Sequence, residues 1–156
     1  MSGPDEALKT SQRLFNRGPD VRYCLEKRMV KEAAPLVAHE LQENPTSDAV
    51  RTNGVLLLAL QGRHQEAQAA VSVILKTLRK NRGYHHHTYN FARVYAMGGK
   101  SEEALKWLRI TVVEGFPCYP LFARDQFLDP IRKDPDVIRF MAEMKERWEG
   151  YQREFG

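Results

Sequence analysis

Apolar and polar residues follow one another at helical spacing along most of this chain. The clearest example spans residues 85–113, where two apolar faces flank the turn Gly98-Gly99-Lys100. Phe91 and Tyr95 lie on one face before the turn, and Leu108 lies on one face after it. This arrangement predicts two helices packed antiparallel as a hairpin.

Apolar residues recur at helical spacing in the rest of the chain as well. Helices are predicted over approximately residues 4–17, 20–27, 31–43, 46–61, 65–79, 86–97, 101–113 and 135–153. The sequence therefore predicts an all-α fold.

The hairpin occurs three times. Residues 62–67 resemble residues 99–104, and residues 28–33 form a third copy without the turn glycine. Aligned on Ala33, Ala67 and Ala104, the copies are separated by 34 and 37 residues. A helix-turn-helix period of about 34 residues is the signature of tetratricopeptide repeats.

The chain thus resembles the tetratricopeptide repeat family over about residues 20–117. The resemblance implies an α-α superhelix of about three hairpins, with residues 4–19 as a preceding helix. Residues 118–156 would form a C-terminal cap on the same single domain. This closing segment is similar to that of some bacterial tetratricopeptide proteins.

The predicted last helix carries a long apolar seam. Its members recur at steps of three and four residues: Val137, Met141, Met144, Trp148, Tyr151 and Phe155. An exposed stack end needs a covering helix, so we expect the first half of the seam to dock on residues 102–113. Its second half either completes this cap or overhangs as a surface for self-association.

The family resemblance also implies a concave groove lined by the first helix of each hairpin. The candidate groove residues are Arg22, Asn53, Leu56, His86, Tyr89, Asn90, Arg93 and Met97. Asn53 and Asn90 occupy equivalent positions, where family members commonly bind a peptide backbone. Arg93 and Arg22 are candidate receptors for a carboxylate. The lysines of the carboxylate clamp are absent, so a chaperone tail is not expected, and simple solvation of the asparagines is the alternative.

Composition excludes several other classes. Apolar residues make up 42% of the chain, but the longest apolar run, residues 55–60, is too short to span a membrane. The net charge is +4, but the basic residues are interleaved with acidic ones along the chain. The one basic cluster, within residues 76–82, falls at a predicted helix end, where cations complement the helix dipole. Nucleic acid is therefore not the expected partner. Cys24 and Cys118 are too few for a disulfide framework, which favours a cytoplasmic protein.

The chain shows no signature of catalysis. It lacks a phosphate-binding glycine loop and the G-x-S-x-G and H-E-x-x-H motifs. Successive residues on a helix point about 100° apart, so His85, His86 and His87 are not expected to share one metal. We expect no catalytic residue, no cofactor and no small-molecule substrate.

The sequence therefore predicts a non-catalytic scaffold that binds a protein or peptide in a concave groove. A regulatory or dimerisation module of a larger bacterial signalling protein, forming a homodimer through its C-terminal helix, is the alternative. An RNA-binding helical repeat is a third interpretation, based on the basic pI alone.

Overall fold

The structure, a computed structural model, describes residues 20–156, and it is helical throughout with no strand in that range. The all-α prediction is confirmed; the helix expected within residues 4–19 lies outside the described part. The helices are α2 (Val21–Glu26), α3 (Val30–Glu43), α4 (Asp48–Leu60), α5 (His64–Leu75), α6 (Tyr84–Met97), α7 (Ser101–Val113), α8 (Tyr119–Arg124), the 3₁₀ helix η1 (Gln126–Ile131) and α9 (Pro135–Phe155). None of these helices is long and apolar enough to cross a membrane.

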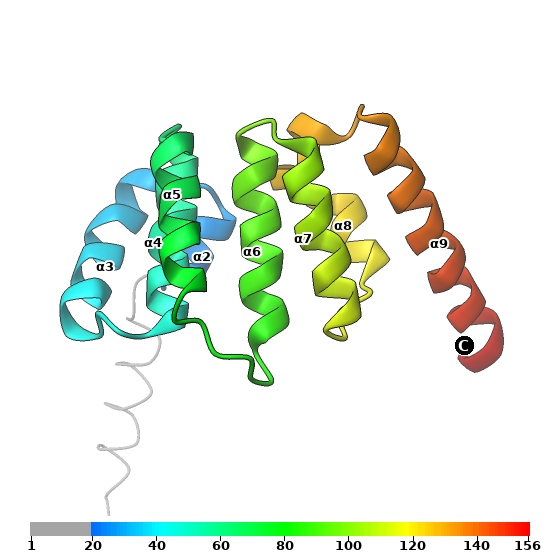
Figure 1. Ribbon diagram of the computed structural model, residues 1–156, viewed down its shortest axis with the longest axis horizontal. Helices are drawn as coiled ribbons and strands as arrows, with labels where there is room; N and C mark the ends of the chain where they lie inside the picture. Colours follow the sequence, from blue (N-terminus) through cyan, green and yellow to red (C-terminus); the bar gives the residue numbers. More distant parts are fainter. Residues whose placement is uncertain (1–19) are drawn as a thin grey trace, which may run out of the picture.

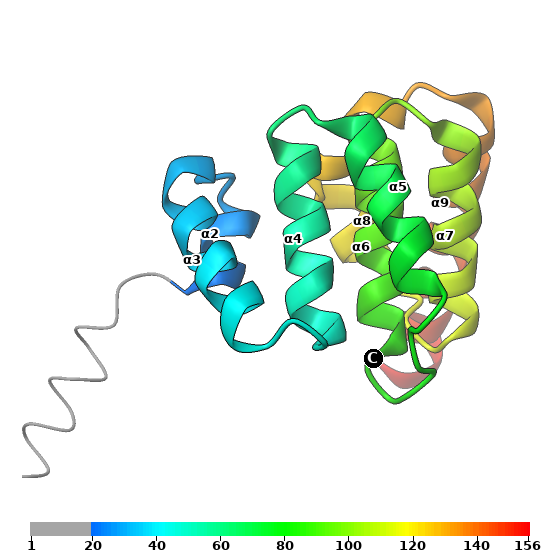
Figure 2. The ribbon, with the colours of Figure 1, turned by 60° about the vertical axis from the view of Figure 1, so that its left-hand side comes forward.

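Three antiparallel hairpins stack side by side, formed by α2 and α3, α4 and α5, and α6 and α7 (Figure 1). The first helices of the hairpins contact one another in order, α2 with α4 and α4 with α6. The second helix of each of the first two hairpins also contacts the first helix of the next hairpin. Figure 2 shows the same succession from a second direction. The helices α2, α4 and α6 therefore form one continuous inner row.

The turns of the three hairpins share one hydrogen-bond pattern. In the second and third hairpins, Gly62 and Gly99 adopt positive φ angles of 77° and 69°. In the first hairpin the same position is held by Arg28, with φ of 56°. Its amide donates to the carbonyl three residues back, as the amides of both glycines do. The turn geometry is thus preserved without the glycine, at a cost in backbone strain.

The three aligned alanines explain why the hairpins pack closely. Ala33, Ala67 and Ala104 each lie in the first turn of the second helix of a hairpin, and all three are fully buried. A methyl side chain at these points lets two helix axes approach each other. The sequence alignment of the copies therefore corresponds to a structural equivalence.

The C-terminal segment packs on the stack in two places. The 3₁₀ helix η1 lies against α6, while α9 lies against α7 and α8. Phe122, Leu128 and Ile131 of this segment are buried in one apolar cluster with Leu108 of α7. The segment after the third hairpin is therefore an integral part of the core.

Two sequence predictions need correction. Helix α5 ends at Leu75 instead of near residue 79, so residues 76–83 form the connection to α6. In α9, Val137 and Met144 are buried as expected, but the third buried position is Phe140, and Met141 is only half-buried. The ring of Phe140 packs near that of Phe122, with ring centroids 6.2 Å apart, which fixes this face of α9 toward the core.

We predict that Phe140→Ala lowers the free energy of unfolding by about 3–5 kcal/mol, because it opens a cavity in a packed cluster. Met141→Ala, one residue away on the same helix, should cost clearly less since its side chain is partly solvated. Urea unfolding followed by circular dichroism measures both. Equal losses for the two variants would contradict the observed orientation of α9.

Candidate functional site

The predicted groove residues lie on the inner helices, but they differ in accessibility. Leu56, Tyr89 and Arg93 are buried. Arg22 and His86 are exposed, and Asn53, Asn90 and Met97 are half-buried. Only some of the predicted groove residues are therefore accessible to a partner.

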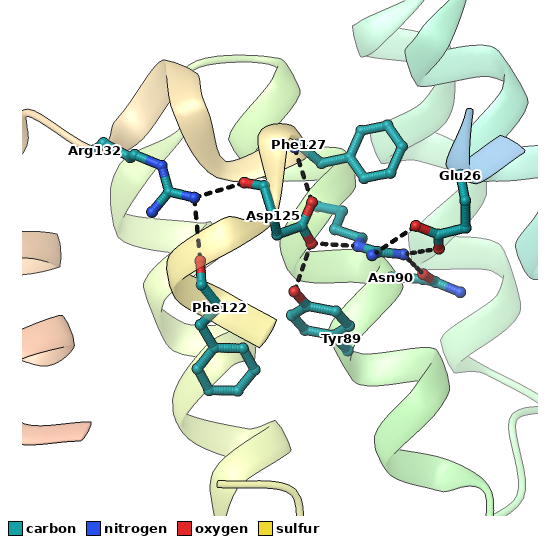
Figure 3. A network of polar contacts seen from close by, with 8 residues as sticks. Glu26, Tyr89, Asn90, Phe122, Asp125, Phe127 and Arg132 are labelled. Atoms are coloured by element: carbon teal, nitrogen blue, oxygen red, sulfur yellow. Dashed lines mark hydrogen bonds and ion pairs between the residues drawn. The ribbon is translucent and has the colours of Figure 1, made fainter. Parts of the chain in front are cut away.

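Arg93 is the centre of a network that joins three parts of the chain. Its Nε donates to Oδ2 of Asp125 at 2.6 Å. Its Nη1 and Nη2 donate to the two carboxylate oxygens of Glu26 at 2.6 and 3.1 Å. Nη1 also reaches Oδ1 of Asn90 at 3.2 Å. One guanidinium thus links α6 to the end of α2 and to the residue between α8 and η1 (Figure 3).

Asp125 uses all of its oxygens. Besides Arg93, its Oδ2 accepts from the Tyr89 hydroxyl at 2.5 Å, and its Oδ1 accepts from the Phe127 amide at 2.9 Å. Its backbone carbonyl accepts from Nη2 of Arg132 at 2.7 Å. The same carboxylate therefore neutralises Arg93 and caps the start of η1 (Figure 3).

The neighbouring groups of this network keep Arg93 protonated and charged and keep the phenol of Tyr89 neutral. Burial alone would lower the pKa of Arg93, but the negative charge of Asp125 and the hydrogen bond that Arg93 donates to Glu26 outweigh it and raise that pKa. Burial and the charge of Asp125 raise the pKa of Tyr89, so its phenol remains a neutral donor. The rings of Tyr89 and Phe127 lie 4.6 and 4.8 Å from the guanidinium carbon of Arg93.

This network corrects the prediction that Arg93 receives a carboxylate from a partner. Its side chain is only 6% exposed, and it is already bound by Asp125 and Glu26 of its own chain. Tyr89 is engaged by the same aspartate, and Leu56 is part of the apolar core. The physical reason is that η1 covers this part of α6.

A hollow remains where the end of α2 meets the C-terminal segment. It has a volume of about 290 Å³, with Phe127 in its wall. Lys27, Arg28 and Arg124 also line it, and none of these three forms an ion pair within residues 20–156. The guanidinium of Arg28 lies 5.0 Å from the Phe127 ring. Together with Arg93, these cations outnumber the two carboxylates of the lining, Glu26 and Asp125, so the hollow has an excess of positive charge.

Arg22 and His86 are the exposed candidates on the inner row. Burial lowers the pKa of His86, and the charges of His85 and Arg22 lower it further. Asn90 is fixed on one side by Arg93, and Asn53 lies half-buried on the neighbouring helix α4. Met97 packs against the core of the stack.

Two of the three consecutive histidines share one environment, because the ring centroids of His85 and His86 are 4.1 Å apart and both rings lie near Phe116. His85 stacks on Phe116 with ring centroids 5.3 Å apart, while His86 is exposed. Nδ1 of His87 lies 3.0 Å from Oγ1 of Thr52, whose hydroxyl donates to the carbonyl of Asp48. It follows that Nδ1 of His87 carries the proton, because the hydroxyl hydrogen is already used. Within residues 20–156 no group of three or more His, Cys, Asp or Glu side chains is placed to hold a metal.

Three important residues were missed by sequence reasoning. Asp125 and Glu26 are single acidic residues in segments without any motif, so nothing in the sequence links them to Arg93. Arg28 offered a signal, because it stands where the other copies have the turn glycine. An arginine in place of the turn glycine is a signal that the side chain at this position has a role of its own.

Comparison with known proteins gives no further assignment: the chain matches no family model, no curated protein and no solved structure.

We predict that Arg93→Ala lowers the free energy of unfolding by about 3–5 kcal/mol, because Asp125 is left as a buried charge without a cation. Arg22→Ala, which removes an exposed arginine from the same inner row, should change it by less than about 0.5 kcal/mol. Chemical denaturation of both variants measures the difference.

Asp125→Asn in the Arg93→Ala background removes the unpaired charge and should recover part of the loss. A small effect of Arg93→Ala alone would contradict the burial of this pair.

Proposed function

We propose that this chain is a non-catalytic protein-binding module of the tetratricopeptide type, which accepts an acidic segment of a partner on its inner row. The observation that carries the proposal is the hollow with its three cations that have no ion-pair partner within residues 20–156. Charge-assisted hydrogen bonds from lysine and arginine are among the strongest that a surface site provides. A carboxylate is the group that these side chains would bind.

The backbone at Arg28 supports this choice of site. A left-handed conformation costs an L-residue roughly 1–2 kcal/mol relative to glycine, and such outliers concentrate at ligand-binding positions. Here the strained position holds a guanidinium at the hollow, beside the Phe127 ring. Glycine would make the same turn with less strain and without the charge.

The volume of the hollow lies at the lower limit for small-molecule pockets. Small-molecule pockets usually measure about 300–1,000 Å³ and bury most of the ligand. At about 290 Å³, this hollow suits one or two acidic side chains of a larger partner.

The accessible groove residues extend the site along the inner row. Arg22 and His86 are both exposed, and the charge of Arg22 acts on His86. The amides of Asn53 and Asn90 both donate and accept hydrogen bonds, as an extended peptide backbone requires. Location in the cytoplasm is part of the same proposal and rests on the cysteine content.

We predict that the chain binds acidic peptides on an array more tightly than matched peptides with Asn for Asp and Gln for Glu. Lys27→Ala and Arg28→Gly should each weaken this binding about tenfold to a hundredfold, as expected for a hydrogen bond between charged groups. Arg28→Gly should leave stability within about 1 kcal/mol of the wild type, since relieved strain offsets the lost ring contact.

Lys106→Ala is the matched control, because it removes an exposed charge from α7, away from the hollow. Capture of acidic and amide peptides alike, or unchanged binding by the Lys27 and Arg28 variants, would contradict the proposal.

A further inference from the structure

Helix α9 extends beyond the surface that it covers. It has 21 residues, whereas α7, on which it packs, has 13. Beyond Met144 its apolar seam becomes accessible: Trp148 is half-buried, and Tyr151 and Phe155 are 49% and 75% exposed. The last two rings stack on each other with centroids 6.4 Å apart. Figure 1 shows the C-terminal end of α9 diverging from the stack.

Beside this projecting end lies an apolar groove between α7 and α9. It has a volume of about 540 Å³ and is lined by Val112, Val113, Phe140 and Met144. Val113 is 83% exposed although it is β-branched and apolar. Charged side chains, including Arg147, form the edge of the groove. One surface therefore carries both an aromatic projection and an apolar groove that could receive it.

We propose that this surface binds a second copy of the chain, with the two α9 helices antiparallel about a two-fold axis. In this arrangement the aromatic end of each α9 enters the groove of the other copy. Trp148 packs against Tyr151 of the partner copy, and Met144 packs against Phe155 of the partner copy. A two-fold axis makes every such contact twice.

Of the possible antiparallel registers of the two α9 helices, the charges beside the seam favour the one that pairs Trp148 with Tyr151 of the partner copy. Trp148 and Met144 occupy the two apolar positions of the heptad repeat. Once these positions are paired between the two copies, the pairing also determines which flanking residues face each other. In the proposed register Arg147 flanks Glu154 of the partner copy. Neither residue forms an ion pair within residues 20–156.

A shift by one heptad, which pairs Trp148 with Met144 of the partner copy, creates repulsion instead. It brings Arg147 beside Arg147 of the partner copy, and Lys145 beside Lys145 of the partner copy. If the two α9 helices were parallel, Arg147 would face only the neutral Gln152 of the partner copy. The charges on α9 therefore favour a second copy in one orientation, and this inference is independent of the acidic-peptide site.

Sedimentation equilibrium of the full chain tests the proposal. The wild type should form a dimer, and Arg147→Glu and Glu154→Arg should each raise the dissociation constant about tenfold or more, because each places like charges together twice. The double variant restores opposite charges and should recover dimerisation. Circular dichroism verifies that each variant is folded.

Arg153→Glu is the matched control, because position 153 lies on the side of α9 opposite the seam and its charge reversal should leave the dimer intact. A wild type that remains monomeric up to millimolar concentration would overturn the proposal. So would a dimer that is insensitive to both single reversals, or a double variant that does not recover.

Discussion

The buried ion pair between Arg93 and Asp125 is the interaction on which the rest of this structure depends. Both side chains are almost completely removed from water, with exposures of 6% and 3%. Such a pair is tolerated only when its remaining hydrogen-bonding capacity is satisfied. Here Tyr89, Glu26 and the backbone of η1 supply the missing partners. The network therefore specifies how the first hairpin, the third hairpin and the C-terminal segment fit together.

This arrangement changes what a stack of hairpins can offer to a partner. Because η1 lies on α6, the inner face near Arg93 is occupied by the chain itself. The positive charge that remains available lies at the edge of that contact, on Lys27, Arg28 and Arg124. The C-terminal segment also leads into α9, whose apolar seam extends beyond α7. The two proposed surfaces thus lie on either side of one folded-back segment.

The sequence was sufficient to predict the features that repeat. Helical spacing gave the all-α class, and the alignment of Ala33, Ala67 and Ala104 identified three positions that are fully buried. Tyr89 and Arg93, which the sequence placed in an open groove, both face the C-terminal segment of the same chain. The partner of Arg93 was not predictable, because Asp125 lies 32 residues away in a segment outside the repeat pattern. Periodicity reports which side of a helix faces inward, but not which distant segment covers it.

Because this network joins them, residues 119–131 should belong to the same cooperative unit as the inner helices. Native-state hydrogen exchange tests it directly, because amides in one unit exchange only when that unit opens. The amides of Phe127 and Leu128, which donate to Asp125, should exchange with the same opening free energy as those in the middle of α6. Exchange at Phe127 and Leu128 that is orders of magnitude faster than in α6 would contradict the account.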